Sequence, residues 1–239
     1  MGSRLSTSKL LILDGTVSYN LQYPVNNGHS FIRYYINLDK RPDRRHDIET
    51  ELERINLKPY TRLPAIQHTQ GALGCTKSHI ECLKLGLASN ADHILVFEDD
   101  FMFTTDAEIV HQVLQNVIST NYDVFLLGFC LDDAKDKLFE TNHPMFKKAT
   151  KSACTHGYMV KRSYASKLLF NFQLSASLLE NTKEEPKYAL DQYWKLLQVD
   201  DNFLCYVKGP LGFQRNGFSD IGKNMNFNLQ TNVEMFQDM

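Results

Sequence analysis

Apolar and polar residues follow one another along this chain in blocks that predict alternating strands and helices. Residues 31–38 are rich in β-branched and aromatic side chains and predict a strand. After Pro42, the apolar residues Ile48, Leu52 and Ile55 share one face of a predicted helix. The chain therefore opens its main fold with a strand, a turn and a helix.

The blocks that follow continue this alternation. Continuous apolar runs within residues 93–97 and 123–128 are typical of strands buried on both faces. Two further strands and four further helices are expected; the strands lie at residues 157–160 and 203–207, and the helices at residues 75–87, 107–118, 164–172 and 190–197. This order predicts an α/β fold in which helices flank a mostly parallel, mixed sheet on both faces.

The same pattern divides the chain into three parts. Residues 1–30 have no clear period and form an N-terminal extension, residues 31–222 form one domain, and residues 223–239 form a tail rich in Asn and Gln. Within the domain, residues 131–150 are charged and contain Pro144. We expect a long surface excursion there, of the kind that often carries binding groups.

Composition narrows the classes of partner. A formal net charge of −2 gives no global attraction to nucleic acid or to an anionic membrane, so nucleic acid is not an expected partner. Any binding of phosphate groups must therefore depend on local basic residues. The five cysteines are odd in number, scattered and never arranged as C-x-x-C, which favours free thiols in a reducing compartment. No apolar run is long enough to span a bilayer and no signal peptide is visible. We expect a cytoplasmic protein: bacterial, or in the host cytosol or virion if viral.

Three adjacent carboxylates, Glu98, Asp99 and Asp100, directly follow the apolar run of residues 93–97. Because adjacent carboxylates repel one another, folded proteins tolerate them mainly when they are solvated or bound to a cation. Open α/β sheets place their ligands at the carboxyl ends of strands, and hard oxygen ligands suit Mg²⁺ or Mn²⁺. The alternative is a solvated acidic turn.

Two other segments carry candidate chemistry. Residues 37–45 lie at the carboxyl end of a strand and place three arginines near a helix start, where guanidinium groups and helix amides suit a pyrophosphate or a nucleobase edge. Ion pairs on a solvated helix, such as Arg45 with Glu49, are the alternative. In residues 74–79, Thr76 could cap the following helix and His79 could be an interior histidine.

Taken together, these segments resemble glycosyltransferase family 25, the group of bacterial lipooligosaccharide galactosyltransferases and collagen hydroxylysine galactosyltransferases. The motifs are Ile-Asn-Leu at residues 36–38, Arg-Pro-x-Arg-Arg at 41–45, Gly-Cys-x-x-Ser-His at 74–79 and Glu-Asp-Asp at 98–100. Gly157-Tyr158, Asp191, Gln214 and Ser219-Asp220 are similar to the family's downstream positions. The resemblance runs in order through residues 32–221.

The resemblance implies a GT-A-type, Rossmann-like fold and an inverting transfer of a hexose, galactose or glucose. The donor would be a UDP-sugar and the acceptor a hydroxyl of a glycan or a hydroxylysine-type protein. Asp191 would be the catalytic base. The residues implied in donor binding are Asn37, Leu38, Arg41, Arg44, Ser78, His79, Glu98, Asp99, Gln214 and Ser219.

The resemblance also implies a Mn²⁺ or Mg²⁺ cofactor at Glu98 and Asp100. Many GT-A enzymes supply a late histidine to the metal, but the last histidine here is His156. We expect Asp220 to take that place, with Asp191, or the acidic residues and substrate alone, as alternatives. Asp191 could instead simply complement the dipole of its own helix.

Two other functions are compatible with these residues. Carboxylates at the end of an α/β strand also serve metal-dependent phosphohydrolases and nucleotidyltransferases, and a transferase fold can be retained as a non-catalytic binding or assembly module. The sequence specifies neither the sugar nor the acceptor, and it does not reveal the oligomeric state.

Overall fold

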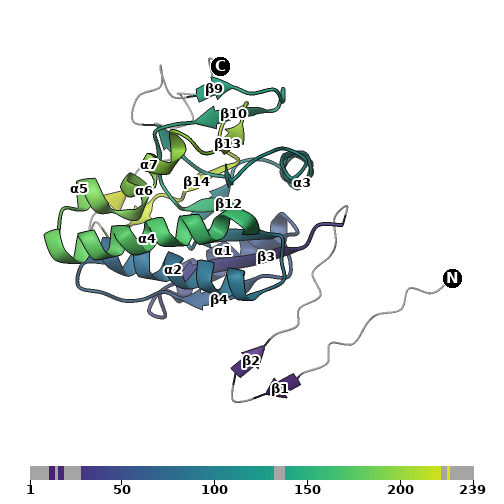
Figure 1. The fold of residues 1–239 in the computed structure, drawn as a ribbon. Coiled ribbons are helices and arrows are strands. Elements are labelled where there is room, and N and C mark those ends of the chain that lie inside the picture. The colour runs from purple at the N-terminus through teal and green to yellow at the C-terminus, as the bar shows by residue number, and fades with distance from the viewer. Residues whose placement is uncertain (1–10, 14–15, 19–27, 132–137, 222–224, 227–239) are drawn as a thin grey trace.

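The computed structural model describes residues 11–13, 16–18, 28–131, 138–221 and 225–226. Within these residues, eight strands form one mixed sheet in the order β4-β3-β5-β12-β7-β13-β10-β9 (Figure 1). The strands are β3 (Phe31–Asn37), β4 (Thr61–Pro64), β5 (His93–Glu98), β7 (Val124–Leu126), β9 (Leu138–Glu140), β10 (Phe146–Ala149), β12 (Gly157–Lys161) and β13 (Phe203–Tyr206).

The strand directions confirm the expected mixed sheet. β3 pairs in parallel with β4 and β5, and β13 pairs in parallel with β7. β12 lies antiparallel between β5 and β7, and β10 lies antiparallel between β13 and β9. Only β10 and β12 of these described strands run against the others. This is the α/β architecture with a mostly parallel, mixed sheet that the sequence predicted.

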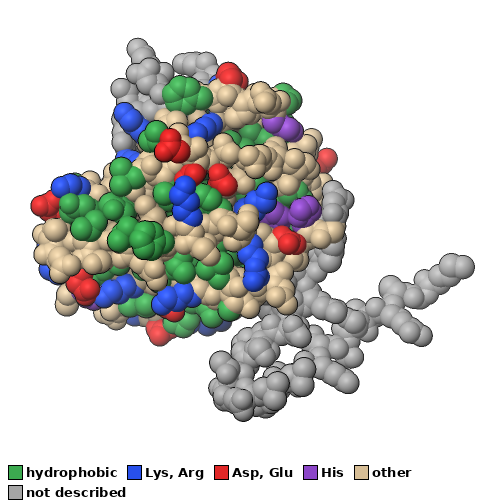
Figure 2. Space-filling model, in the orientation of Figure 1, with side chains coloured by type: hydrophobic (Ala, Val, Ile, Leu, Met, Phe, Trp, Pro, Cys, Tyr) green, Lys and Arg blue, Asp and Glu red, His purple; other side chains and the backbone are tan. Residues whose placement is uncertain are grey.

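Helices cover both faces of the sheet, as predicted. α1 (Pro42–Arg54) and α3 (Ala107–Val117) pack on one face, and α2 (Gly71–Ala88) and α4 (Arg162–Thr182) lie side by side on the other (Figure 1). The short helices α5 (Glu185–Tyr188), α6 (Leu190–Tyr193) and α7 (Lys195–Gln198) follow α4. Apolar side chains are exposed over α4 in Figure 2, and Phe170 and Leu174 are among the exposed residues of that helix. None of the described helices has both the length and the apolar character needed to cross a membrane.

Successive residues of β5 alternate between two apolar cores. Ile94 and Val96 face the core under α2 and α4, whereas Leu95 and Phe97 face the core under α1 and α3. All four are buried. The continuous apolar run therefore reflects a central strand covered on both sides, as the sequence predicted.

The expected start of the second helix is wrong. α2 begins at Gly71, and its N-cap residue Gln70 makes no side-chain capping bond. Thr76 is consequently inside the helix and is not its cap: its Oγ1 donates to the carbonyl of Ala72 at 2.8 Å. Gly71 and Gly74 belong to the first turns of the helix, where a Cβ atom would lie 2.8 Å from Ile221 Cα and 2.5 Å from the Ile66 carbonyl oxygen.

Two other expectations need correction. Residues 190–197 form the two short helices α6 and α7 in place of one helix, with Trp194 between them donating its indole N–H to the carbonyl of Ser152 at 2.9 Å. Residues 131–150 are not only a surface excursion, because β9 and β10 extend the main sheet. Residues 132–137 of that segment, most of the N-terminal extension and most of the C-terminal tail lie outside the described residues.

The remaining described strands form four two-stranded sheets. β6 pairs with β14, β8 with β11, β1 with β2, and β15 with β16. Their bounds are β1 (Leu11–Leu13), β2 (Thr16–Ser18), β6 (Phe101–Phe103), β8 (Cys130–Leu131), β11 (Ser152–Ala153), β14 (Gly212–Gln214), β15 (Gly217–Phe218) and β16 (Met225–Asn226). The β6–β14 pair lies directly after the acidic triplet and brings Gln214 opposite Phe101.

Candidate functional site

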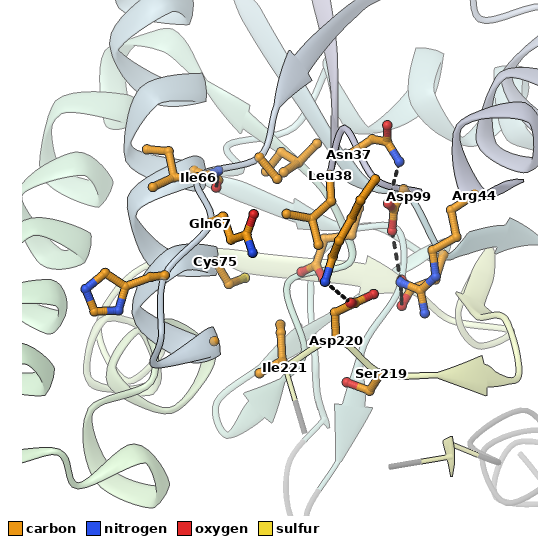
Figure 3. Close-up of a pocket in the computed structure, with 18 of the residues that line it drawn as sticks. Asn37, Leu38, Arg44, Ile66, Gln67, Cys75, Asp99, Ser219, Asp220 and Ile221 are labelled. Carbon is orange, nitrogen blue, oxygen red and sulfur yellow. Dashed lines mark hydrogen bonds and ion pairs between the residues drawn. The ribbon is translucent and has the colours of Figure 1, made fainter. Parts of the chain in front are cut away.

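A cavity of about 320 Å³ opens at the carboxyl ends of β3 and β5. Its walls are the end of β3, the loop of residues 65–69, one side of α2, the acidic triplet and residues 219–221 (Figure 3). Ten of the residues singled out from the sequence line it: Asn37, Leu38, Arg44, Ser78, Glu98, Asp99, Asp100, Gln214, Ser219 and Asp220. This is where the strand-end rule for open α/β sheets places a ligand.

Asn37 organises the centre of the site. Its side-chain Nδ2 donates to Asp99 Oδ2 at 2.7 Å and to the carbonyl of Arg41 at 3.0 Å, and its Oδ1 accepts from Arg62 Nε at 3.0 Å. Because these bonds occupy its amide, Asn37 holds other groups in place. Leu38 adds an apolar side chain to the cavity wall.

Arg44 is the cation closest to the acidic triplet. Its NH1 lies 3.0 Å from Asp99 Oδ1 and 3.2 Å from Asp100 Oδ2, and its NH2 donates to the carbonyl of Phe218 at 2.8 Å. Figure 3 shows Asn37, Asp99 and Arg44 linked in a row. One guanidinium therefore connects the first helix, the acidic triplet and the C-terminal part of the described chain.

The three carboxyl groups differ in their surroundings. Burial, followed by the charge of Glu98, raises the pKa of Asp100 to about 7. Burial also raises the pKa of Asp99, against the opposing effect of Arg44. Burial disfavours ionised Glu98 as well, but the close contact with His79 and the charge of that ring outweigh it, and the pKa of Glu98 is lowered.

Two further cations, Lys40 and Arg41, bind Asp220. Lys40 Nζ lies 2.7 Å from Asp220 Oδ1, and Arg41 NH1 lies 2.7 Å from Asp220 Oδ2. Asp220 is thus engaged by two positive charges. Arg41 also binds Asp43 and is not among the residues that line the cavity. Lys40, which does line it, stood within the basic segment of the sequence but was not singled out.

Ser78 and His79 have mainly internal partners. The Ser78 hydroxyl accepts from the amide of Ile66 at 2.8 Å and donates to the carbonyl of Gly74 at 2.8 Å, so it fastens the loop of residues 65–69 to α2. His79 is fully buried and does not line the cavity. Its Nε2 lies 3.3 Å from Glu98 Oε1.

Asp191 is not among the residues that line the cavity. The sequence suggested an exposed helix start, but the carboxylate is half-buried on the short helix α6 and its Oδ2 accepts from the amide of Cys154 at 3.1 Å. Burial raises the pKa of Asp191, and the charge of Glu98 adds to that shift. The structure therefore places Asp191 near the acidic triplet without showing it in the cavity wall.

The loop of residues 65–69 was not found from the sequence. Ala65, Ile66, Gln67, His68 and Thr69 all line the cavity. They have no periodic pattern and no charged side chain, so no signal distinguished them from an ordinary connection. Their position depends on α2, because a Cβ atom at Gly74 would lie 2.5 Å from the carbonyl oxygen of Ile66.

The acidic triplet fits a hard divalent cation in its chemistry. Asp100 Oδ1 is buried and has no hydrogen-bond partner among the described residues, as expected for an oxygen that serves a cation. The expected ligands Glu98, Asp100 and Asp220 are not assembled within mutual reach, however. In the part of the chain that the structure describes, only Cys75, His79 and Glu98 bring three ligand atoms within 4.8 Å of one another.

A protein-family model matches this chain. The family described as glycosyltransferase family 25 (LPS biosynthesis protein) matches residues 60–178. No curated protein sequence matches the chain.

Similar solved structures include A197 from STIV, with 12% identity, a TM-score of 0.46 and coverage of 82% of this chain and 92% of that one. The glycosyltransferase GlyE of Streptococcus pneumoniae TIGR4 has 10% identity, a TM-score of 0.44 and coverage of 73% and 44%. A glycosyltransferase involved in glycosylation of the major capsid of PBCV-1 has 9% identity, a TM-score of 0.40 and coverage of 74% and 92%.

Proposed function

The chain belongs to glycosyltransferase family 25 and is a transferase, and from this premise we propose that it moves a hexose from a UDP-sugar to an acceptor hydroxyl, with inversion and with the help of Mn²⁺ or Mg²⁺. The observation that carries the proposal is the cavity itself. Carboxylates and cations line it together at the carboxyl ends of two parallel strands: Arg44 is paired with Asp99 and Asp100, and Lys40 is paired with Asp220. A diphosphate with a divalent cation complements this distribution of charge. A glycan or hydroxylysine-type acceptor, bound beside the cavity, completes the proposal.

The cations provide the diphosphate site. Lys40 and Arg41 are held near the cavity by Asp220, and Arg44 is held by Asp99 and Asp100. Guanidinium and ammonium groups bind phosphate oxygens through charge-assisted hydrogen bonds. The nucleoside would then lie toward the loop of residues 65–69, which adds largely neutral surface to the same cavity.

Glu98 and Asp100 are the proposed protein ligands of the metal, with donor oxygens completing the coordination. A bound Mn²⁺ or Mg²⁺ supplies Lewis-acid stabilisation of the charge on the departing nucleoside diphosphate. Asn37 and Arg44 orient Asp99 beside these ligands. Asp220 can join them only by leaving Lys40 and Arg41, so an Asp220→Ala variant tests its expected role as a ligand: unchanged Mn²⁺ affinity removes it.

Asp191 is the proposed general base. A carboxylate whose pKa is raised by burial is a better proton acceptor than a solvated one, and an inverting displacement needs a base on the face opposite the leaving group. We expect Asp191→Asn to lower kcat by about 10²- to 10⁴-fold with little change in donor affinity. Asp200→Asn, at an exposed carboxylate, is the matched control. Near-normal turnover of Asp191→Asn would assign the proton transfer to another group.

Thermal stability against a panel of nucleoside diphosphates and their sugars tests donor binding. A ligand that binds only the folded state raises the unfolding midpoint by mass action. We expect the largest shift with a uridine-diphosphate sugar and Mn²⁺, and loss of that shift with chelator or in Asp100→Asn. No shift with any nucleotide contradicts the donor assignment. Phosphate-ester hydrolysis without sugar transfer favours a phosphohydrolase.

A further inference from the structure

A sulfur, nitrogen and oxygen cluster lies at one side of the cavity, apart from the all-oxygen set of Asp99 and Asp100. Cys75 and His79 are four residues apart on α2 and therefore share one face of the helix. Glu98, at the end of β5, meets them there. One ligand atom from each residue lies within 4.8 Å of the others, and His79 Nε2 is 3.3 Å from Glu98 Oε1.

The nitrogen at the centre of this cluster is an unsatisfied buried group. His79 is 0% exposed, and its Nε2 has no hydrogen-bond partner among the described residues because the approach to Glu98 lacks hydrogen-bond geometry. Buried polar atoms in folded proteins nearly always have a partner, and an exception calls for an ion or another ligand. The lone nitrogen is thus a second observation, independent of the residue types, that indicates a ligand.

The contacts behind the cluster are those found behind metal ligands. His79 Nδ1 lies 3.1 Å from the hydroxyl of Tyr158, which fixes the ring and leaves Nε2 to face Glu98. Thr155 Oγ1 donates to Glu98 Oε1 at 3.0 Å. Histidine and carboxylate ligands of protein metals are typically held by such outer hydrogen bonds, which set the tautomer and the orientation.

We propose that Cys75, His79 and Glu98 form a site for a borderline divalent transition metal of the Zn²⁺ class. Thiolate and imidazole ligands favour such metals over Mg²⁺ and Mn²⁺, which prefer oxygen. Three protein ligands leave one tetrahedral position open. Since Cys75 and Glu98 line the cavity, we expect water or an oxygen of a bound molecule to reach the metal from there.

Glu98 belongs both to this site and to the oxygen ligands proposed for Mn²⁺ or Mg²⁺. The consequence of this overlap rests on the proposed transferase function. A metal held by Cys75, His79 and Glu98 takes Glu98 away from the oxygen set that would serve Mn²⁺ or Mg²⁺. Zn²⁺ is therefore expected to weaken the Mn²⁺-dependent stabilisation by UDP in the unchanged chain, and to do so less in Cys75→Ser. The metal site itself does not depend on that function and is tested without nucleotide.

Cobalt spectroscopy provides the direct test. The full chain, reduced and freed of metal by chelation, is titrated with Co²⁺ while the near-ultraviolet absorption is followed. We expect one equivalent to bind with a thiolate-to-cobalt charge-transfer band, which Zn²⁺ abolishes and excess Mg²⁺ does not. Absence of that band in the unchanged chain overturns the proposal, whatever the variants do.

Variants locate the site. Cys75→Ser should remove the charge-transfer band, and His79→Gln should weaken Co²⁺ binding by at least tenfold. Cys82→Ala is the matched control, because Cys82 is a buried cysteine of the same helix outside the cluster. Tyr158→Phe keeps the ring, removes the outer hydrogen bond and should weaken binding about tenfold. A band that survives Cys75→Ser and disappears in Cys154→Ser places the metal elsewhere and refutes the assignment.

Discussion

At the scale of single residues, Arg44 explains how two nearly buried carboxylates coexist at the end of β5. Asp99 and Asp100 are each 8% exposed and adjacent in the chain, so they repel one another in a region with little water. Arg44 contacts both. Its removal leaves negative charge buried without compensation, which costs more than an ordinary ion pair contributes.

Replacing Arg44 with Gln is therefore expected to lower the free energy of unfolding in metal-free solution by about 3–5 kcal/mol, as for other broken buried pairs. Urea denaturation measures this loss, and added Mn²⁺ should recover more stability in the variant than in the unchanged chain because a cation then faces the same carboxylates. Arg45→Gln, at a half-exposed pair with Glu49, is the control and should change little. Equal effects of the two substitutions would argue against a special role for Arg44.

The sequence identified the acidic triplet as one unit, but its members serve different neighbours. Glu98 is the last residue of β5 and faces His79 and Thr155, whereas Asp99 faces Asn37 and Arg44. The strand ends at Glu98 and the chain turns at residues 99–100, so the three adjacent carboxylates do not share one direction. The location of the site was predictable from residue order. The division of the triplet depended on α2, which is distant in sequence.

At the scale of elements, the α2 glycines allow the cavity wall to pack closely on the helix. A Cβ atom at Gly74 would lie 2.5 Å from the Ile66 carbonyl oxygen, and one at Gly71 would lie 2.8 Å from Ile221 Cα. Both contacts involve backbone atoms, which cannot move aside as a flexible side chain can. Glycine is a less favourable helix former than alanine, but at these two positions it allows α2 to contact two walls of the cavity.

Gly74→Ala sets two opposing effects against each other. Alanine favours the helix by about 1 kcal/mol over glycine, whereas overpacking against a backbone carbonyl costs about 1–3 kcal/mol and displaces residues 65–69. We expect the steric cost to exceed the gain, so urea denaturation should show a net loss of stability. Gly217→Ala is the control, since nothing lies within 4 Å of a Cβ atom there. A gain in stability in Gly74→Ala would mean that the loop yields easily.

The elements differed in how far the sequence could predict them. β5 was recognisable because an unbroken apolar run is followed by charged residues. α3 was recognisable because its residues carry a consistent amphipathic pattern over several turns. β6 and β14 have three residues each, and α6 and α7 have four. Such short elements contain little more than one period of a strand or helix pattern. Their positions depend on tertiary contacts, such as the bond from Trp194 to Ser152.

At the scale of the whole molecule, β5 runs from the cavity at one end of the sheet to the opposite end of the sheet. Glu98 ends the strand at the cavity, and His93 begins it about five residues away, buried beside Tyr122 and His29. The same strand separates the two apolar cores. Changes in the ionisation of His93 should therefore affect global stability without touching the cavity.

Burial lowers the pKa of His93 from 6.5 to about 4; the titratable or charged groups that face it are His29, Asp92, Tyr122 and Lys161. Between these pH values the unfolded chain binds a proton at this residue and the folded chain does not. Stability from His93 is thus complete above pH 6.5 and is lost as the pH falls toward 4, by roughly 3 kcal/mol at most.

Buried His156, with a pKa of about 4, acts in the same direction, whereas Asp100, with a pKa raised to about 7, acts in the opposite one. The pH dependence of the free energy of unfolding therefore contains contributions from several groups. The difference between the unchanged chain and a His93 variant isolates the contribution of His93. We expect His93→Gln to be less stable than the unchanged chain at pH 7, and the gap to narrow steadily in urea denaturation series down to pH 4. A gap that stays constant with pH would show that His93 titrates alike in the folded and unfolded chain, and that its role at the start of β5 is limited to packing and hydrogen bonding.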